Sequence, residues 1–334
     1  MGMVVRVDVK RLLYALPHSR TLRELARNAK VSHTAVRRVV KELSKDGSFR
    51  VITDDSFYNL TKLVAFVDKV PERLPFGTTG VRLFNSLEGR KIGVFAYLPR
   101  PLAEDYIRSL SEEAHVLEWF ASTDYVAWLP HPELESIAPR DFDSLVDRAH
   151  ELIPPRTNLR PLPMLDQIDL VLLWGKLLLG PFARPTEIYN RLLAEGEKVE
   201  APSKQVLSYH YRVHIQPGWR YNTYFKYTSH EELPFTAYYM KGKEAEKVAR
   251  ALALLPRLGM SIIGQGKALY LGQPLCAYHP LLVEIPQTYV VEPLTMYMKL
   301  DLYTDVPRLW KLLDPETKRW RWVEEKIPVK AQSQ

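Results

Sequence analysis

The sequence predicts an α+β protein in which two winged helix-turn-helix domains alternate with two ferredoxin-like domains of βαββαβ order. Three observations favour this class: short amphipathic helices near the N-terminus, apolar runs of period two after them, and a partial repeat of this order in the second half. The expected domains are winged helices at 1–60 and 166–230, ferredoxin-like units at 61–138 and 231–304, a linker at 139–165 and a C-terminal extension at 305–334.

Residues 20–45 form the clearest element, a helix, a tight turn and a second helix. Thr21 and Ser32 are side chains that cap helix N-termini, and apolar residues follow each of them at helical spacing. Ala26 is small where the two helices would cross, and Gly47 is a stop signal for the second helix. Residues 5–16 would add a first helix and complete a three-helix unit.

The second of these helices has the residue types of a DNA-recognition helix. Residues 20–45 hold eight Lys or Arg against two Glu, and the residues expected to contact DNA are Ser32, His33, Thr34, Arg37, Arg38 and Lys41. Either Arg37 or Arg38 could contact guanine while the other holds phosphate, and the sequence leaves both assignments open. Residues 48–60 alternate as a hairpin that turns at Asp54-Asp55, a wing that would present Arg50. The alternative is a solvated basic surface helix.

Charge is unevenly distributed along the chain. The formal net charge is +7, and residues 1–50 hold twelve Lys or Arg against four Asp or Glu. Residues 51–165 hold twelve against seventeen, so the cations are concentrated at the N-terminal end. Clustered cations of this kind indicate a polyanion-binding end on an acidic body.

The second half repeats the plan with a lengthened turn. Helices are expected within 165–180, 183–195 and 201–215, followed by a second wing. The residues expected to contact DNA there are Ser203, Lys204, Gln205, Ser208, Tyr209, Arg212 and Arg220. The alternative is that the aromatic residues of this region pack a core or a domain interface; these are Tyr209, Tyr211, Trp219 and Tyr224.

The segments DQIDLVLL with ARPTEI in the second half, and SRTLRELARNAKVSHTAVRRVVKEL in the first, resemble the Lrp/AsnC family of regulators, here duplicated in tandem. The resemblance implies a transcriptional regulator that binds double-stranded DNA and forms homo-oligomers through its ferredoxin-like domains. It also implies a small-molecule effector, although the sequence contains no clear effector-binding glycine motif. Two such units fused in one chain would bind an asymmetric DNA site, because their two recognition helices differ in sequence.

A rival interpretation is enzymatic. Siroheme decarboxylases resemble the same architecture and use His and Arg to bind a tetrapyrrole, and the candidate histidines here are His115, His210, His214 and His279. His210 and His214 are spaced i, i+4 and could ligate a metal, but no third ligand lies nearby in the sequence. We therefore expect no bound metal and no cofactor. P-loop, GxGxxG and nucleophile-elbow motifs are absent from the sequence.

The cysteine count and the absence of long apolar segments indicate the cellular location. Cys276 is the single cysteine, which excludes an intramolecular disulfide and fits a reducing, cytoplasmic location. We expect no signal peptide or membrane span, and the 25 prolines fit a thermophilic, archaeal-type source. The basic aromatic segment KRWRW (318–322) leaves a protein-interaction role open. The interpretation that the sequence favours is a DNA-binding transcriptional regulator, with a tetrapyrrole decarboxylase as the alternative.

Overall fold

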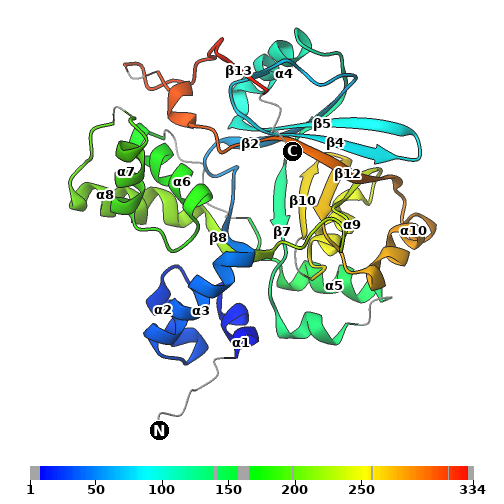
Figure 1. The fold of residues 1–334 in the computed structure, drawn as a ribbon, viewed down its shortest axis with the longest axis horizontal. Coiled ribbons are helices and arrows are strands. Elements are labelled where there is room, and N and C mark those ends of the chain that lie inside the picture. Colours follow the sequence, from blue (N-terminus) through cyan, green and yellow to red (C-terminus); the bar gives the residue numbers. More distant parts are fainter. Residues whose placement is uncertain are drawn as a thin grey trace.

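The computed structural model describes residues 8–137, 141–156, 165–197, 199–256, 259–314 and 316–329 (Figure 1). It is a mixed α/β structure built on one large antiparallel sheet. The α-helices are α1 Val9–Ala15, α2 Leu22–Ala29, α3 His33–Asp46, α4 Ala103–Ser111, α5 Phe142–Leu152, α6 Gln167–Leu179, α7 Pro185–Ala194, α8 Lys204–His210, α9 Ala245–Ala253 and α10 His279–Thr288. The strands are β1 Gly47–Thr53, β2 Leu60–Val67, β3 Arg73–Pro75, β4 Thr78–Ser86, β5 Gly89–Pro99, β6 Val116–Ala121, β7 Asp124–Ala127, β8 Trp219–Lys226, β9 Thr236–Lys241, β10 Gly259–Gly264, β11 Lys267–Gly272, β12 Glu292–Thr304 and β13 Lys326–Pro328.

The N-terminal helices begin where the sequence places their caps. The Thr21 hydroxyl accepts from the Glu24 amide at 3.1 Å, and the Ser32 hydroxyl accepts from the Ala35 amide at 3.2 Å. Each cap satisfies an amide that the first turn leaves unpaired. Ala26 is buried in the core that the N-terminal helices share. These helices share a core that includes Leu12, Leu16, Leu25, Ala26, Val36, Phe49 and Tyr224.

The predicted wing hairpin over residues 48–60 was wrong. Strand β1 pairs antiparallel with β8 from the second half of the chain, so that Gly47 faces Lys226 and Ile52 faces Tyr221. The two strands form a separate two-stranded sheet, which Figure 1 shows between the helices of the two halves. Each strand follows a helical segment of its own half and supplies the ladder partner that a local hairpin would have supplied.

Residues 54 and 55 turn the chain from β1 into β2, and Asp55 is more than a turn residue. Its carboxylate is buried and accepts hydrogen bonds from Thr53 and Tyr97, each at 2.9 Å, and from the ammonium of Lys62. A buried carboxylate is tolerated only with such partners. The pair Asp54-Asp55 therefore fixes the start of β2.

The large sheet has nine strands in the order β6-β2-β5-β4-β12-β9-β11-β10-β7, with every neighbouring pair antiparallel. The first four strands come from the first half of the chain and the next four from the second half. They join where β4 pairs with β12, with Ser86 facing Met296 and Gly80 facing Thr304. Strand β7 crosses from the first half to pair with β10, so the first half contributes one strand to the second half's side of the sheet.

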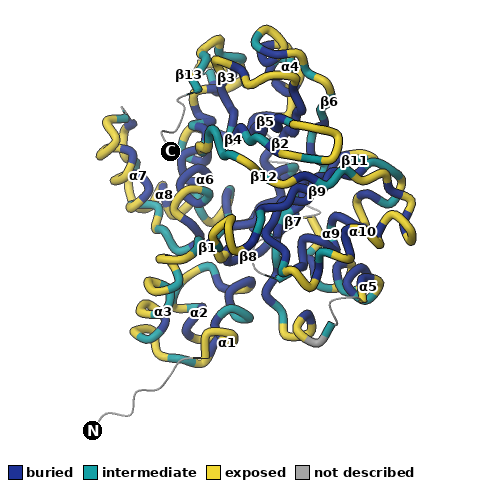
Figure 2. Tube along the Cα trace, turned by 45° about the vertical axis from the view of Figure 1, so that its right-hand side comes forward, coloured by how far each residue is buried: buried dark blue, intermediate teal, exposed yellow. Residues whose placement is uncertain are grey.

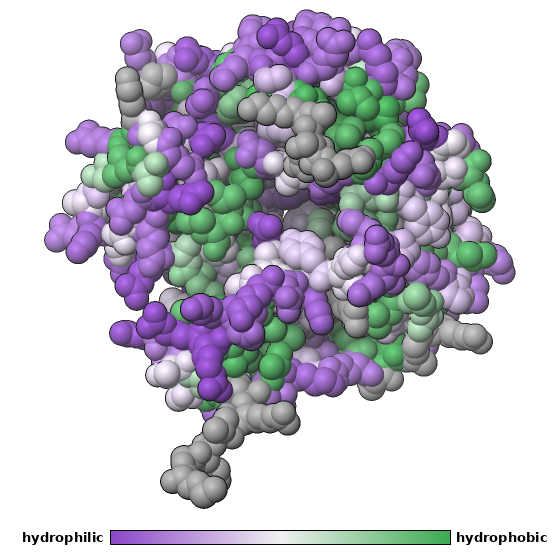
Figure 3. All heavy atoms as spheres, in the orientation of Figure 1, coloured by the Kyte–Doolittle hydropathy of each residue, from purple (hydrophilic) through white to green (hydrophobic). Residues whose placement is uncertain are grey.

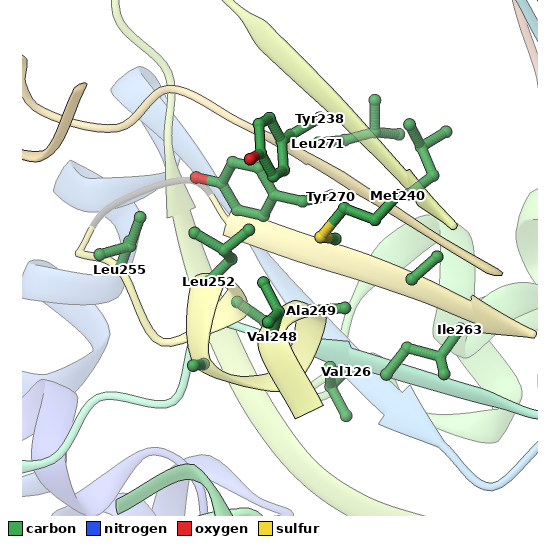
Figure 4. Close-up of a cluster of buried hydrophobic side chains, with 14 of the residues drawn as sticks. Val126, Tyr238, Met240, Val248, Ala249, Leu252, Leu255, Ile263, Tyr270 and Leu271 are labelled. Atoms are coloured by element: carbon green, nitrogen blue, oxygen red, sulfur yellow. The ribbon is translucent and has the colours of Figure 1, made fainter. Parts of the chain in front are cut away.

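The core of the second half lies between α9 and this sheet. In Figure 2 strands β9 and β11 are almost wholly buried, whereas α3 and α7 carry long exposed stretches. Figure 4 shows one face of α9 directed at the sheet; the labelled side chains include Val248, Ala249 and Leu252 from α9 and Tyr238, Met240, Tyr270 and Leu271 from the strands. The helical spacing of these α9 residues places them on one apolar stripe.

Helix α6 is apolar almost throughout and packs against α7 at Gly175. A Cβ at this position would lie 2.3–2.6 Å from three side-chain atoms of Ile188. We expect Gly175→Ala to lower the free energy of unfolding by about 1–2 kcal/mol, because overpacking costs ~1–3 kcal/mol and alanine regains up to ~1 kcal/mol in a helix. Urea denaturation will measure the change. In an Ile188→Ala background the same substitution should cost nothing; an equal loss in both backgrounds would refute the packing explanation.

The expected linker at 139–165 and the C-terminal extension both contain regular structure. Helix α5 occupies part of the expected linker, whereas residues 138–140 and 157–164 of that linker lie outside the described residues. The end of the chain adds β13, which pairs with β3. Within the described residues, every helix is too short or too polar to cross a bilayer.

Candidate functional site

A basic groove of about 530 Å³ lies between the N-terminal helices and the α6–α7 pair. Figure 3 shows hydrophilic side chains gathered over α2 and α3, at the lower left of the molecule. The groove's charged and ionisable lining residues are Arg20, Arg23, His33, Arg37, Lys176, Arg184, Glu187 and Tyr211. Five cationic side chains thus share one concavity with a single carboxylate.

Three helices begin at this groove. Arg20 and Thr21 precede α2, His33 starts α3, and Arg184 precedes α7. The N-terminus of a helix carries unpaired amides and about half a unit of positive charge. Helix starts from both halves of the chain therefore add to the positive potential of the groove, which is the arrangement that binds phosphates and carboxylates.

The arginines of the groove are available to a ligand. Among the ion pairs of the described residues none engages Arg20, Arg23 or Arg37, and Arg184 lies 3.9 Å from Glu187. Guanidinium groups bind carboxylates through two parallel hydrogen bonds. The groove can accordingly hold several carboxylates at once.

Lys176 forms the floor of the groove. Its side chain is buried, and its ammonium donates to the carbonyl oxygens of Pro181 at 2.9 Å and Ala183 at 2.5 Å. It also lies 4.7 Å from the centre of the Tyr211 ring and 5.3 Å from that of Trp219. Burial lowers the pKa of Lys176 to about 8. An amine near this value can change its charge when an anion binds above it.

The lowered pKa gives Lys176 a signature in stability. Between about pH 8 and pH 10.5 the unfolded chain binds the proton that the folded chain has released, so stability should rise with pH through that window. We expect the free energy of unfolding of the wild type, relative to that of Lys176→Met, to increase by about 2 kcal/mol between about pH 7.5 and pH 9.5. Urea denaturation of both proteins at both pH values measures this difference, in which the ionisation of tyrosines cancels. A constant difference would show that the amine titrates normally.

Near the groove, two histidines meet a buried carboxylate. Asp169 of α6 accepts from His210 Nδ1 at 2.8 Å and lies 2.9 and 3.0 Å, through its two oxygens, from His214 Nδ1. Burial raises the pKa of Asp169, and the hydrogen bond from His210 opposes that rise. No third ligand lies near the His pair in the sequence, but the fold places Asp169, 41 residues before His210 in the chain, beside it in space.

A second, apolar cavity of about 760 Å³ lies between the β4–β5 turn, α10 and β12. Its lining includes Leu87, Val283 and Tyr297, which are exposed, together with Cys276 and His279. The Nε2 atom of His279 is buried and has no hydrogen-bond partner. Lys and Arg are absent from its described lining, which distinguishes it from the basic groove. The remaining candidate, His115, is exposed immediately before β6 and is not among the lining residues of either cavity. Its backbone amide donates to the Asp68 carboxylate at 2.9 Å.

The residues predicted to contact DNA fall into different structural environments: some line the groove, some cap helices and others are exposed. His33 and Arg37 line the groove, while Ser32 caps α3 and Thr34, Arg38 and Lys41 are exposed on that helix. In the second half Ser203 caps α8, and Tyr209 packs its ring edge against His210 and His214 at 5.6 and 5.5 Å. The other exposed members are Lys204, Gln205, Ser208 and Arg212.

Two predicted phosphate contacts are corrected. Arg220 is 1% exposed and binds Asp124 at 2.7 Å and the carbonyls of Tyr125 and Pro154, so it holds β8 against β7. Arg50 of β1 donates to the carbonyl of Leu177 in α6 at 2.9 Å. The guanidinium groups of Arg220 and Arg50 therefore bind acceptors within the protein. The alternative interpretation of Trp219 and Tyr224 as packing residues is confirmed by their burial.

Sequence reasoning missed most of the groove as a site. Arg23, Lys176, Arg184 and Tyr211 belong to four different elements, and periodicity within one element cannot bring them together. One signal was present: Arg20 and Arg184 occupy equivalent places before the second helix of each half. The structure brings both to the same groove.

No protein-family model and no curated protein sequence matches the chain. Among solved structures, the chain is similar to the crystal structure of the siroheme decarboxylase NirDL, with a TM-score of 0.50 and 11% identity over 90% of this chain and 94% of that one. NirDL in co-complex with an iron-uroporphyrin III analogue gives a TM-score of 0.49 and 11% identity over 90% and 93%.

The first of these matches shows that the two chains share a fold over nearly their whole lengths. The prediction of a DNA-binding transcriptional regulator was wrong: the solved structure that shares the fold of this chain is a siroheme decarboxylase, and two of the arginines assigned to DNA are bound within the protein.

Proposed function

We propose that this protein binds an iron tetrapyrrole rich in carboxylate side chains and removes carboxyl groups from it. The observation that carries the proposal is the basic groove, in which five cations and three helix N-termini surround one concavity. A fold shared with a siroheme decarboxylase supports the choice of substrate class.

The groove matches the chemistry of such a substrate. Tetrapyrroles of the uroporphyrin type carry acetate and propionate groups around a flat apolar ring. In the proposed complex Arg20, Arg37 and Arg184 bind carboxylates at the edge of the ring, while the ring rests on apolar surface such as Leu22 and Phe182. The volume of about 530 Å³ suits one edge of the macrocycle, with the rest lying across the open mouth.

Decarboxylation of an acetate group breaks the bond between its methylene carbon and the carboxylate, and CO₂ leaves. The electron pair stays on the methylene carbon, which takes up one proton and becomes a methyl group. Tyr211 lies on the groove wall, and burial raises its pKa, so it keeps its phenolic proton at neutral pH. We assign it the delivery of that proton, with the Lys176 amine behind its ring.

The proposal includes an architecture. The strand orders β6-β2-β5-β4 and β12-β9-β11-β10 are those of ferredoxin-like units, each following a group of helices. The second unit has both helices, α9 and α10, whereas the first has α4 and carries the short strand β3 between β2 and β4. We propose that the two halves are Lrp/AsnC-like units joined in tandem and used as an enzyme. The domain boundaries given above and assembly into homo-oligomers stay predictions, as does the response to a small-molecule effector.

The test is binding and turnover with defined tetrapyrroles. Purified protein is titrated with siroheme and with iron uroporphyrin III, following absorbance, and the products are analysed by mass spectrometry for loss of CO₂. We expect saturable binding of one tetrapyrrole per chain and stepwise decarboxylation of siroheme. Absence of binding to either compound at micromolar concentration would refute the proposal.

A further inference from the structure

The cluster formed by Asp169, His210 and His214 is separate from the groove chemistry proposed above. Asp169 lies in the first turn of α6, His210 is the last residue of α8, and His214 lies in the π-helical turn Tyr211–Ile215 that continues it. The side chain of Asp169 is 1% exposed, and those of His210 and His214 are 12% and 22% exposed. The cluster is therefore closed on the Asp169 side and reaches solvent on the His214 side.

The local backbone holds these three groups in place. Asp169 takes part in a capping box, in which its carboxylate accepts from the Asp166 amide at 3.2 Å and its own amide donates to the Asp166 carboxylate at 2.9 Å. The π-helical turn occurs where both histidines must reach one carboxylate, and such turns are frequent at functional sites. The carboxylate is thereby oriented before anything binds to it.

The charge of Asp169 is also uncompensated by permanent cations. Its ion-pair partners among the described residues are histidines, with no Lys or Arg. A buried carboxylate requires a positive partner. An imidazole, unlike Lys or Arg, is not a permanent cation, so a metal ion at the centre of the cluster would supply the positive partner.

We propose that Asp169, His210 and His214 form a binding site for a divalent transition-metal ion, with Zn²⁺ as the best-matched ion. Two imidazole nitrogens and one carboxylate oxygen are a common zinc ligand set, and all three ligand atoms lie within 4.8 Å of one another. Metal–ligand bonds of 2.0–2.1 Å in a tetrahedron place ligand atoms about 3.3 Å apart. The distances from Asp169 to the two histidine nitrogens are 2.8–3.0 Å and need to widen by a few tenths of an ångström, while the two histidine nitrogens lie within 4.8 Å of each other.

The site leaves one coordination position for water or for a further ligand. Asp166 is the nearest candidate, since one of its carboxylate oxygens lies 3.6 Å from His210 Nδ1 and its side chain is 40% exposed. Tyr209 covers the solvent side with its ring against both histidines. A site with three protein ligands and an open position is the type that keeps a bound water.

The experiment uses untagged, metal-free protein carrying Cys276→Ser, because the exposed thiol of Cys276 could bind zinc by itself. Calorimetric titration with Zn²⁺ should give one ion per chain, and titration with Co²⁺ should give the visible absorption of a four-coordinate site with nitrogen and oxygen ligands. We expect Asp169→Asn, His210→Ala and His214→Ala each to weaken binding by at least about a hundredfold, beyond the ~10–100-fold effect of outer-shell changes. The matched control is His115→Ala, an exposed histidine outside the cluster, which should bind as the parent does.

Two outcomes would overturn the proposal. One is the absence of Zn²⁺ binding by the parent protein, and the other is equal binding by the cluster variants and His115→Ala. Circular dichroism of the metal-free variants checks that they are folded. Where a variant fails to fold, the Co²⁺ spectrum of the parent decides: four-coordinate absorption supports the site, and the weak spectrum of six-coordinate Co²⁺ refutes it. These measurements do not involve a tetrapyrrole, so they stand or fall independently of the proposed enzyme.

Discussion

Replacing Asp124 with Asn will lower the free energy of unfolding by about 3–5 kcal/mol, the cost of leaving a buried charge without its partner. Asp124 is 4% exposed and binds Arg220, itself 1% exposed, at 2.7 Å, and Arg250 at 2.5 Å. This trio joins β7, β8 and α9, which come from both halves of the chain. Asparagine keeps the shape but removes the charge, so the guanidinium of Arg220 stays buried and unpaired. Urea denaturation followed by circular dichroism measures the loss.

The matched control is Asp105→Asn. Asp105 pairs with Arg108 on the surface of α4 at 3.1 Å, where the arginine side chain is 73% exposed. Exposed pairs of this kind contribute at most about 1 kcal/mol. If Asp124→Asn destabilises no more than Asp105→Asn, the trio does not hold the two halves together as argued.

Local elements of this fold follow from the sequence, because their causes are local. Thr21 and Ser32 cap the helices that they were expected to cap, and Ala26 is buried in the core of these helices. Gly47 ends α3 as expected, but for a different reason. Its φ is −171°, an extended value, and a Cβ there would lie 2.2 Å from the carbonyl oxygen of Phe225 in β8. Glycine is needed because β8 passes close by, a contact that spacing along the chain does not reveal.

The long-range pairings could not be predicted in the same way. An alternating strand such as β1 carries the same pattern whether its partner is the next segment or β8. Hairpin formation was the expectation because neighbouring strands usually pair. The same limit applies to the contacts of single side chains. The sequence does not show that Arg220 pairs with Asp124, or that Asp169 of α6 lies beside His210.

The groove leads to the second large effect. We expect the double variant Arg37→Ala/Arg184→Ala to weaken binding of siroheme by about a hundredfold or more, because each hydrogen-bonded charge contributes ~1.5–3 kcal/mol. Arg37 comes from α3 and Arg184 from the start of α7, so the pair removes a cation from each wall of the groove. Absorbance titration at a fixed salt concentration gives the two affinities. Both side chains are at the surface, and the variant should keep the stability of the wild type.

The matched control is Arg38→Ala/Arg191→Ala, which removes the same charge from the same two helices. Both arginines are exposed and outside the groove. A similar loss of affinity in both double variants would mean that net charge attracts the tetrapyrrole without a specific site.

The apolar cavity is tested by His279→Ala, because the Nε2 atom of His279 is the unpartnered group there. If that variant loses siroheme binding while Arg37→Ala/Arg184→Ala retains it, the substrate lies against α10 and β12, and the basic groove has another role. Loss confined to the groove variant places the substrate carboxylates in the basic groove, between α3 and the start of α7.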